Sequence, residues 1–348
     1  MIDGHGDDLH KYENISLNFS SNIYPRADIS PLLEHLKQHL DSIRTYPEPD
    51  AASLEEAIAE KIGIPKENVL ATAGATEAIY LIAQTLRSWQ TFNVKYPAFS
   101  EYEDACRMHL YREDVLGNLM WVCNPCNPTG EVVSDIEIIE LLQRHRYLIV
   151  DQSYEDYTNE KVMTPAEAVR IPNLIQIHSL TKKYAVPGLR IGYITANAGI
   201  IRLLRGNIRP WSINTLAIEA GKYLLQNSKG AVPDMVEYLR CTQRLRFSLA
   251  ALEGLEARPT KTNFILCRLK KGKASELKEW LAREKGILIR DASNFRGLYE
   301  GHFRVVSSND EDNNILVEAI KEFLDIKKAA NQAASEQNKN LELTDNAE

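Results

Sequence analysis

The chain has 348 residues, of which 44% are hydrophobic and 26% charged, and its formal net charge is −7. This length predicts a large and a smaller domain, and the acidic balance without a basic stripe argues against a nucleic-acid-binding protein. No apolar run is long enough to cross a membrane, and the start lacks the pattern of a secretory signal. Five cysteines are a low and odd count, so we expect reduced thiols and a cytoplasmic protein.

Residues 1–30 are expected to form an N-terminal arm, and strand-like runs then alternate with amphipathic helices over residues 31–235. The expected helices are 53–62, 76–86 and 134–144. The expected buried strands are 147–151, 174–178 and 191–195. Ser-x-x-Glu capping boxes should begin the helices at Ser53 and Ser134. This alternation predicts an α/β domain with a mainly parallel sheet, in which ligands bind at the carboxyl ends of the strands.

After residue 235 the predicted order is helix, strand, helix, strand and helix, which indicates a smaller C-terminal α/β domain over residues 236–325. The expected elements are helices at 236–252, 275–285 and 313–324, and strands at 263–268 and 303–307. Residues 326–348 are rich in Ala, Asn, Gln, Glu and Lys and have almost no large apolar side chains. We therefore expect them to form a disordered tail.

The most informative segment directly follows the predicted strand 174–178. Ser179 and Thr181 precede Lys182, and Arg190 follows that lysine by eight residues. An amine forms an imine with an aldehyde, while hydroxyls and a guanidinium hold a phosphate dianion. The segment therefore predicts a cofactor that has both an aldehyde and a phosphate.

This segment resembles the lysine motif of the fold-type I pyridoxal-phosphate enzymes, in the aminotransferase class I and II family, and the resemblance covers about residues 3–325. It implies pyridoxal 5'-phosphate as the cofactor, carried by Lys182 as a Schiff base. It places Asp151 at the pyridine nitrogen, and Tyr154 and Asn127 at the ring oxygen. Cys123-x-x-Cys126 has no second ligand pair at a comparable spacing, so no metal is expected.

The resemblance also assigns the cofactor phosphate. Gly74, Ala75 and Thr76 begin a predicted helix, whose free backbone amides form an anion site. Tyr102 matches the aromatic residue that stacks on the pyridine ring. Tyr46 matches the tyrosine that reaches the cofactor phosphate of the other subunit, which implies a homodimer with a shared active site.

A second group of residues matches the substrate positions of the family. Arg304 corresponds to the arginine that binds a substrate α-carboxylate, and Arg290 and His5 would bind a phosphate. Asn22 would line the carboxylate side of the pocket and Asn214 the cofactor side. These matches imply a small, phosphorylated, amino-acid-like substrate.

Two branches of the family are similar to this chain. The threonine-phosphate decarboxylases of cobalamin biosynthesis share the cofactor residues and further motifs near both ends, whereas Tyr154 favours the histidinol-phosphate aminotransferases. A non-catalytic ligand sensor of the same fold is the alternative from a different class; such regulators place a DNA-binding domain ahead of the fold, whereas only a short acidic arm precedes it here. The presence of Lys182 and Asp151 argues against an inactive member of the family. The stretch 107–121 is shorter than is usual in the family, so we expect a trimmed sheet edge.

Overall fold

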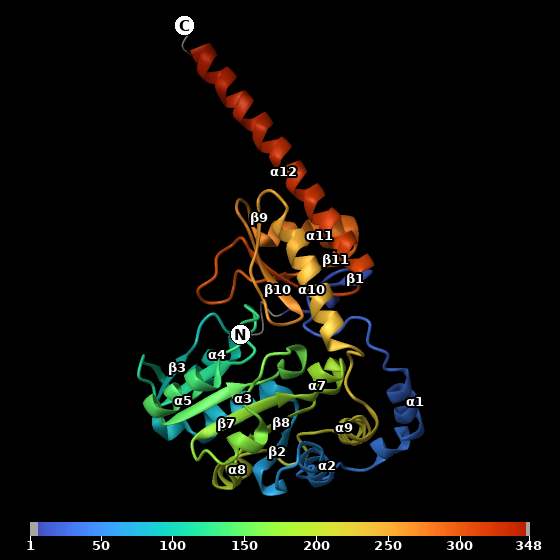
Figure 1. The fold of residues 1–348 in the computed structure, drawn as a ribbon, viewed down its shortest axis with the longest axis vertical. Coiled ribbons are helices and arrows are strands. Elements are labelled where there is room, and N and C mark those ends of the chain that lie inside the picture. Colours follow the sequence, from blue (N-terminus) through green and yellow to red (C-terminus); the bar gives the residue numbers. More distant parts are fainter. Residues whose placement is uncertain (1–5, 346–348) are drawn as a thin grey trace.

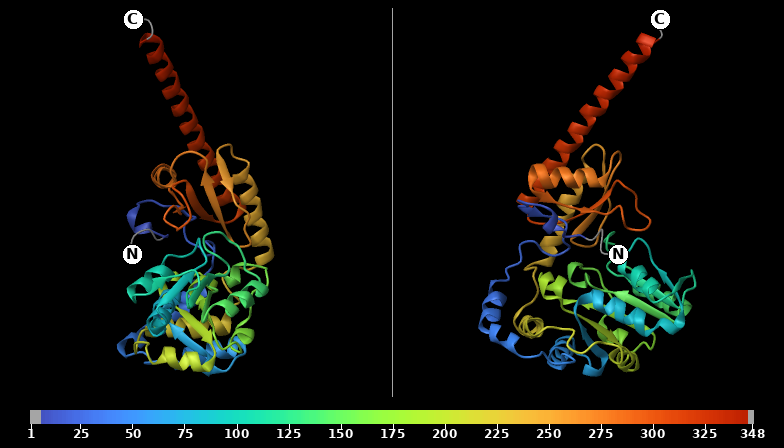
Figure 2. Two further views of the ribbon diagram at one scale, coloured as in Figure 1. Left: turned by 90° about the vertical axis from the view of Figure 1, so that its left-hand side faces the viewer. Right: turned by 180° about the vertical axis from the view of Figure 1, so that it is seen from behind.

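The computed structural model describes residues 6–345. Two domains lie one above the other, and a long C-terminal helix extends from the smaller domain (Figure 1). Figure 2 shows from two further sides that this helix points away from both domains. Among the described residues, no helix has the length and apolar character needed to span a membrane.

The large domain is built on a seven-stranded sheet with the order β2-β8-β7-β6-β5-β3-β4. Strands β3 to β7 run parallel, whereas β8 is antiparallel to both β7 and β2. The strands are β2 (Val69–Thr72), β3 (Thr91–Val94), β4 (Arg112–Glu113), β5 (Leu119–Cys123), β6 (Tyr147–Asp151), β7 (Leu174–Ser179) and β8 (Gly192–Ala196). The predicted α/β domain with a mainly parallel sheet is therefore confirmed.

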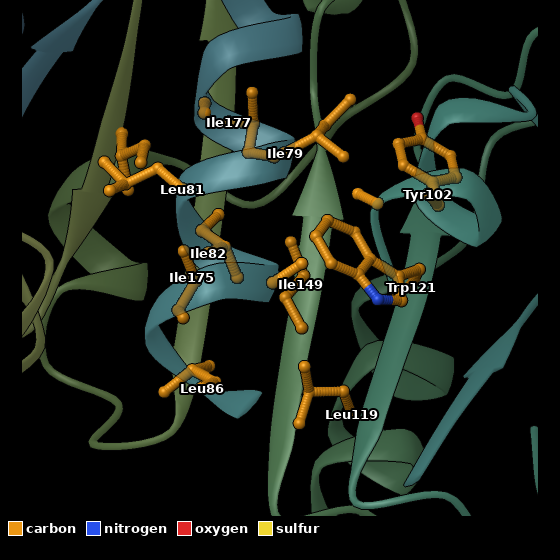
Figure 3. Packing of buried hydrophobic residues seen from close by; sticks show 14 of the residues in the cluster. Ile79, Leu81, Ile82, Leu86, Tyr102, Leu119, Trp121, Ile149, Ile175 and Ile177 are labelled. Atoms are coloured by element: carbon orange, nitrogen blue, oxygen red, sulfur yellow. The ribbon is translucent and has the colours of Figure 1, made fainter. Parts of the chain in front are cut away.

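Helices cover both faces of this sheet, which explains why its central strands are continuous apolar runs. The helices are α1 (Ser30–Gln38), α2 (Ala52–Ile62), α3 (Gly74–Thr85), α4 (Glu101–Met108), α5 (Asp135–Arg144), α6 (Pro165–Ala168), α7 (Leu180–Lys183), α8 (Ala198–Arg205) and α9 (Thr215–Asn227). Figure 3 shows Ile79 and Ile82 of α3 packed over Ile149, Ile175 and Ile177 of the central strands. This packing fixes the start of α3 beside the carboxyl ends of the strands.

The small domain has a four-stranded antiparallel sheet with the order β12-β13-β10-β9. Its elements are α10 (Met235–Ala250), β9 (Leu255–Ala257), β10 (Phe264–Leu269), α11 (Ala274–Lys285), β11 (Ile287–Leu288), β12 (Arg290–Asp291), β13 (His302–Val306) and α12 (Asp310–Asp345). Short 3-10 turns connect elements in both domains: η1 (Leu9–Lys11), η2 (Leu40–Arg44), η3 (Lys66–Asn68), η4 (Arg87–Trp89), η5 (Glu155–Tyr157) and η6 (Pro187–Leu189). The predicted smaller α/β domain is present.

Two sequence expectations about the ends of the chain are wrong. We expected the N-terminal arm to be a linker rather than a packed element, but it is packed. Its strand β1 (Leu17–Asn18) pairs with β11, and Phe19 is buried in the core of the small domain. The part of the expected disordered tail from residue 326 to residue 345 is helical, because α12 continues to Asp345. Ala, Glu, Gln and Lys are strong helix formers, so a segment poor in apolar residues still forms a helix.

The capping boxes behave differently from each other. Ser134 caps α5, and its side chain accepts a hydrogen bond from the Glu137 backbone. Ser53 does not cap α2, which begins after Ala51 in a left-handed conformation, and the Ser53 N–H donates to the Glu48 carboxylate at 2.7 Å. At the sheet edge, the short stretch 107–121 contains only the two-residue strand β4 before β5 begins.

Candidate active site

A cavity of about 230 Å³ lies where the carboxyl ends of β5, β6 and β7 face the small domain. Its walls come from the large domain, the small domain and the N-terminal segment. Most of the residues predicted from the sequence line it together: Asn22, Ala75, Thr76, Tyr102, Asn127, Asp151, Tyr154, Ser179, Thr181, Lys182, Arg190, Arg290 and Arg304. The position agrees with the expectation that ligands bind at the strand ends of an open α/β sheet.

Lys182 lies in α7, the short helix that directly follows β7. Its Nζ atom is 5.8 Å from the centre of the Tyr154 ring. Burial lowers the pKa of Lys182 to about 8, and the positive charges of Arg304 and Arg190 act in the same direction. The amine is therefore neutral in a larger fraction of molecules than an ordinary lysine, which makes it the better nucleophile. Its neighbour Lys183 instead forms an ion pair with Asp156, at 2.7 Å.

Asp151 ends β6 and is the buried carboxylate of the site. Its Oδ2 atom accepts a hydrogen bond from the Tyr102 hydroxyl at 2.7 Å, and its Oδ1 atom accepts two from Ser153, at 2.9 and 2.6 Å. Burial raises the pKa of Asp151. Tyr102 stacks on Trp121 with 5.4 Å between the ring centres (Figure 3). A cationic partner such as a protonated ring nitrogen would stabilise the carboxylate at this position.

The start of α3 and Arg190 form one end of the cavity. Gly74 has a φ of +82°, and a Cβ atom added to it would lie only 2.6 Å from Nη2 of Arg190. The hydroxyls of Ser179 and Thr181 are 2.8 Å apart and line the cavity. Helix N-terminal amides, hydroxyls and a guanidinium are the groups that bind a phosphate dianion. This end of the cavity therefore fits the phosphate of pyridoxal phosphate.

Two buried arginines line the other side of the cavity. Arg304 on β13 donates to the backbone oxygen of Ser20 at 2.7 Å and to the Oδ1 atom of Asn127. Arg290 on β12 donates to the Asn294 side chain at 2.9 Å. Burial lowers the pKa of both arginines, because a dry environment disfavours the charged form.

Several buried polar atoms have no hydrogen-bond partner among the described residues. They include both amide atoms of Asn22 and the Nε atom of Arg304. Buried polar groups are nearly always satisfied in folded proteins, so unpaired atoms around a cavity indicate the place of a ligand. Asn22 and Arg304 therefore fit the predicted substrate side of the site.

Three expected residues, Gly74, Tyr46 and Asn214, are not among the described residues that line the cavity. Tyr46 is 85% exposed and packs near Trp211, with 5.6 Å between the ring centres. Asn214 caps α9 by accepting a hydrogen bond from the Ala217 backbone at 2.9 Å. His5 lies outside the described residues.

Sequence reasoning missed a tyrosine that positions the lysine. The Tyr157 hydroxyl donates to the backbone oxygen of Lys182 at 2.8 Å and accepts a hydrogen bond from the Tyr24 backbone at 2.9 Å. Its only sequence signal is that it follows Tyr154 by three residues. The sequence analysis also did not predict the remaining residues that line the cavity, which are Gly6, Asp7, Ser20, Ser21, Phe99, Ser100, Cys123, Ser153, Asn294 and Phe295.

Comparison with known proteins agrees with this geometry. The sequence pattern of the family Aminotransferase class I and II matches residues 14–320. A protein of Caldanaerobacter subterraneus subsp. tengcongensis, provisionally described as a threonine-phosphate decarboxylase, is 32% identical over 91% of this chain and 93% of that protein. The histidinol-phosphate aminotransferase of Thermoanaerobacter pseudethanolicus is 30% identical over 86% of this chain and 90% of its own. The crystal structure of L-threonine-O-3-phosphate decarboxylase from Porphyromonas gingivalis has a TM-score of 0.84 and 37% identity, covering 89% of this chain and 99% of that one.

Proposed function

The chain belongs to the aminotransferase class I and II family, whose members use pyridoxal 5'-phosphate, and on this premise we propose that it decarboxylates L-threonine O-3-phosphate to (R)-1-amino-2-propanol phosphate. This is a step of cobalamin biosynthesis. The observation that carries the proposal is the arrangement of Arg290 and Arg304. Both are buried and line the same cavity as Lys182.

The two arginines are direct partners across the β12–β13 pair, so their side chains project from the same face of the sheet. Their Cα atoms are about 4.5–5.5 Å apart, as in any antiparallel pair. Besides burial, the positive charge of Arg290 lowers the pKa of Arg304. A ligand with two nearby anionic groups would relieve this repulsion. Threonine phosphate has its carboxylate and phosphate on neighbouring carbons, and its amine, on the same carbon as the carboxylate, would face Lys182.

Pyridoxal phosphate, when bound, supplies a ring that takes up the electron pair of the bond broken at the substrate Cα. The carboxylate of Asp151 holds the proton on the ring nitrogen, which keeps the ring a strong electron acceptor. Arg190 and the start of α3 bind the cofactor phosphate. These groups orient the ring against the substrate side of the cavity.

Arg304 and Arg290 decide which bond at Cα breaks, because they fix the two anionic ends of the substrate. For decarboxylation, the two arginines would hold the substrate so that the bond from Cα to the carboxylate breaks and carbon dioxide leaves. Lys182 then returns a proton to Cα. A pKa of about 8 allows this amine to accept and donate a proton near neutral pH.

Transamination of histidinol phosphate is the second candidate, and Tyr154 favours it. The Tyr154 phenol lines the cavity beside Lys182 and corresponds to the residue expected in that branch. In this reaction Lys182 would remove the proton from Cα and transfer it within the site. The same cofactor residues would serve both reactions, but histidinol phosphate has no carboxylate, so the two substrates would use Arg304 and Arg290 differently.

We further propose a homodimer in which Tyr46 reaches the cofactor phosphate of the partner subunit. Tyr46 is exposed on its own chain, together with the nearby apolar residues Ile43 and Trp211, which are 65% and 50% exposed. An exposed apolar group of this kind is typical of an interface. His5 is proposed as a phosphate ligand. A cytoplasmic location is supported by the five cysteines, all unpaired.

A substrate comparison tests the proposal directly. In one reaction the holoenzyme is incubated with L-threonine O-3-phosphate, and the release of carbon dioxide is measured. In a parallel reaction it is incubated with histidinol phosphate and 2-oxoglutarate, and the formation of glutamate is measured. We expect carbon dioxide from the first reaction. Glutamate from the second reaction alone would overturn the decarboxylase assignment in favour of the aminotransferase. A Lys182→Ala protein that kept the visible absorbance band of lysine-linked cofactor would overturn the role of Lys182.

A further inference from the structure

A group of metal-ligating side chains lies on the outside of the large domain, between α1 and α9. His35 is in α1, His39 directly follows that helix, and Glu219 is in α9. One ligand atom from each residue lies within 4.8 Å of the others. Figures 1 and 2 show α1 and α9 side by side at the edge of the domain. None of the three is among the described residues that line the active-site cavity.

We propose that His35, His39 and Glu219 bind a divalent transition-metal ion of the zinc class. Two histidines four residues apart lie on the same face of a helical segment, where both rings can reach one ion. The Nε2 atoms of His35 and His39 are 2.9 and 3.8 Å from Oε1 of Glu219. Ligands bound tetrahedrally to zinc at about 2.0–2.1 Å are about 3.3 Å apart. The two observed separations lie on either side of that value, so small side-chain rotations complete the site.

The rings are already oriented for metal binding. The Nδ1 atom of His39 is 2.8 Å from the backbone oxygen of His35, so it carries the proton and the lone pair of Nε2 faces Glu219. The His35 ring stacks on Tyr223 and lies tilted by 31° against His39, with 4.2 Å between the ring centres in each pair. A backbone hydrogen bond on the second ring nitrogen is the usual partner of a metal-bound histidine. The preset orientation reduces the entropy cost of binding an ion.

The surroundings of the three side chains also suit a metal ion. Lys222 lies 3.6 Å from Oε2 of Glu219, whereas Oε1 is the oxygen that faces the two histidines. The side chains of His35, His39 and Glu219 are 19%, 40% and 25% exposed, so an ion can enter and keep one water ligand. Two imidazoles and one carboxylate favour zinc over magnesium, which prefers oxygen ligands.

The position of the site gives it a structural role. The turn η2 and Tyr46 directly follow His39 along the chain. A metal ion that joins α1 to α9 would hold the beginning of this segment against the large domain. The ion would thereby stabilise the segment that carries Tyr46, without taking part in the chemistry at Lys182.

The test uses the full-length holoenzyme after treatment with a chelator. Zinc chloride is titrated by calorimetry, the melting temperature is recorded with and without zinc, and cobalt(II) serves as a spectroscopic probe. We expect one zinc ion per chain, a higher melting temperature with zinc but not with magnesium, and a cobalt spectrum typical of nitrogen and oxygen ligands.

Two variants and one control locate the ion. Glu219→Gln keeps the size of the side chain and an oxygen for the hydrogen bond with His35, and His39→Ala removes the more exposed imidazole. Both should weaken zinc binding at least tenfold, and the melting temperature of each metal-free variant shows whether it is folded. His10→Ala, at an exposed histidine of η1, should bind zinc as the wild type does. If the wild type shows no stoichiometric zinc binding, or if the two variants bind zinc as tightly as the wild type, the proposal is wrong and the group is only an ion pair.

Discussion

Replacing Gly74 with alanine perturbs the cofactor phosphate site with one methyl group. Gly74 begins α3 with a φ of +82°, in the left-handed region that favours glycine. The added Cβ atom would lie 2.6 Å from Nη2 and 3.1 Å from Cζ of Arg190. Because the guanidinium is the end of a flexible side chain, we expect Arg190 to move away while the helix stays in place.

Two contributions set the size of the effect: the cost of the left-handed conformation and the loss of hydrogen bonds from Arg190 to the phosphate. A left-handed conformation costs a residue with a Cβ atom about 1–2 kcal/mol, which lowers the free energy of unfolding. A displaced guanidinium loses charge-assisted hydrogen bonds to the phosphate, worth about 1.5–3 kcal/mol. Since 1.4 kcal/mol corresponds to a tenfold change, the Kd for pyridoxal phosphate should rise about 10-fold to 100-fold.

The assay is a titration of cofactor-free protein with pyridoxal phosphate, followed by visible absorbance, together with chemical denaturation. Gly63→Ala is the matched control, because Gly63 has a φ of +70° after α2 and a Cβ atom there would meet nothing within 4 Å. The control should lose similar stability but keep the wild-type Kd. If Gly74→Ala binds the cofactor as the wild type does, or if Gly63→Ala loses the same affinity, the assignment of Gly74 and Arg190 to the phosphate is refuted.

Three further predictions concern the substrate side, the lysine and an ion pair between the two domains. Arg304→Lys loses the planar fork that reaches Asn127, so the KM for the phosphorylated substrate should rise about 10-fold to 100-fold, and an unchanged KM would contradict this role. Burial lowers the pKa of Lys182 to about 8. The rate at which the cofactor attaches should therefore increase with pH and level off above that value. A midpoint of this pH profile near the ordinary lysine pKa of 10.5 would argue against a buried amine. Arg296 forms an ion pair with Glu113 at 2.7 Å between the two domains, and the Arg296 side chain is half exposed. Because exposed ion pairs contribute little, Arg296→Ala and Glu113→Gln should each raise KM only about 2-fold to 5-fold. If the effects of the two substitutions are fully additive in the double variant, the pair does not act as a unit.

Much of the candidate site could be predicted because its signals are local. Ser179, Thr181, Lys182 and Arg190 lie within one short segment after a strand, and their spacing brings them to the same end of the cavity. Asp151 similarly ends a buried apolar run. The strands and helices that the sequence predicted lie within a few residues of the observed ones, apart from the end of α12, because their periodicity follows from backbone geometry. The buried strands β2 and β5 were not predicted.

The errors occurred where local signals compete or are very short. Ser53 is followed by the expected glutamate, but Glu48 accepts the Ser53 N–H instead. The strand β1 has only two residues, too few for a periodic pattern, and it forms because β11 offers a partner. In α12, the low apolar content of residues 326–345 led to the expectation of a disordered tail, whereas the helix continues to Asp345.

The sequence by itself determined the class of fold and the cofactor, and it predicts Lys182 as the residue that carries the cofactor, because those features depend on residues close together along the chain. Only the tertiary structure decided how the substrate side is assembled. Arg304 reaches Asn127 across 177 positions and Ser20 across 284, and it lies beside Arg290 through strand pairing. Contacts over such separations arise from the packing of domains, which no local pattern of residues specifies, and it is these contacts that bring two cations to one cavity.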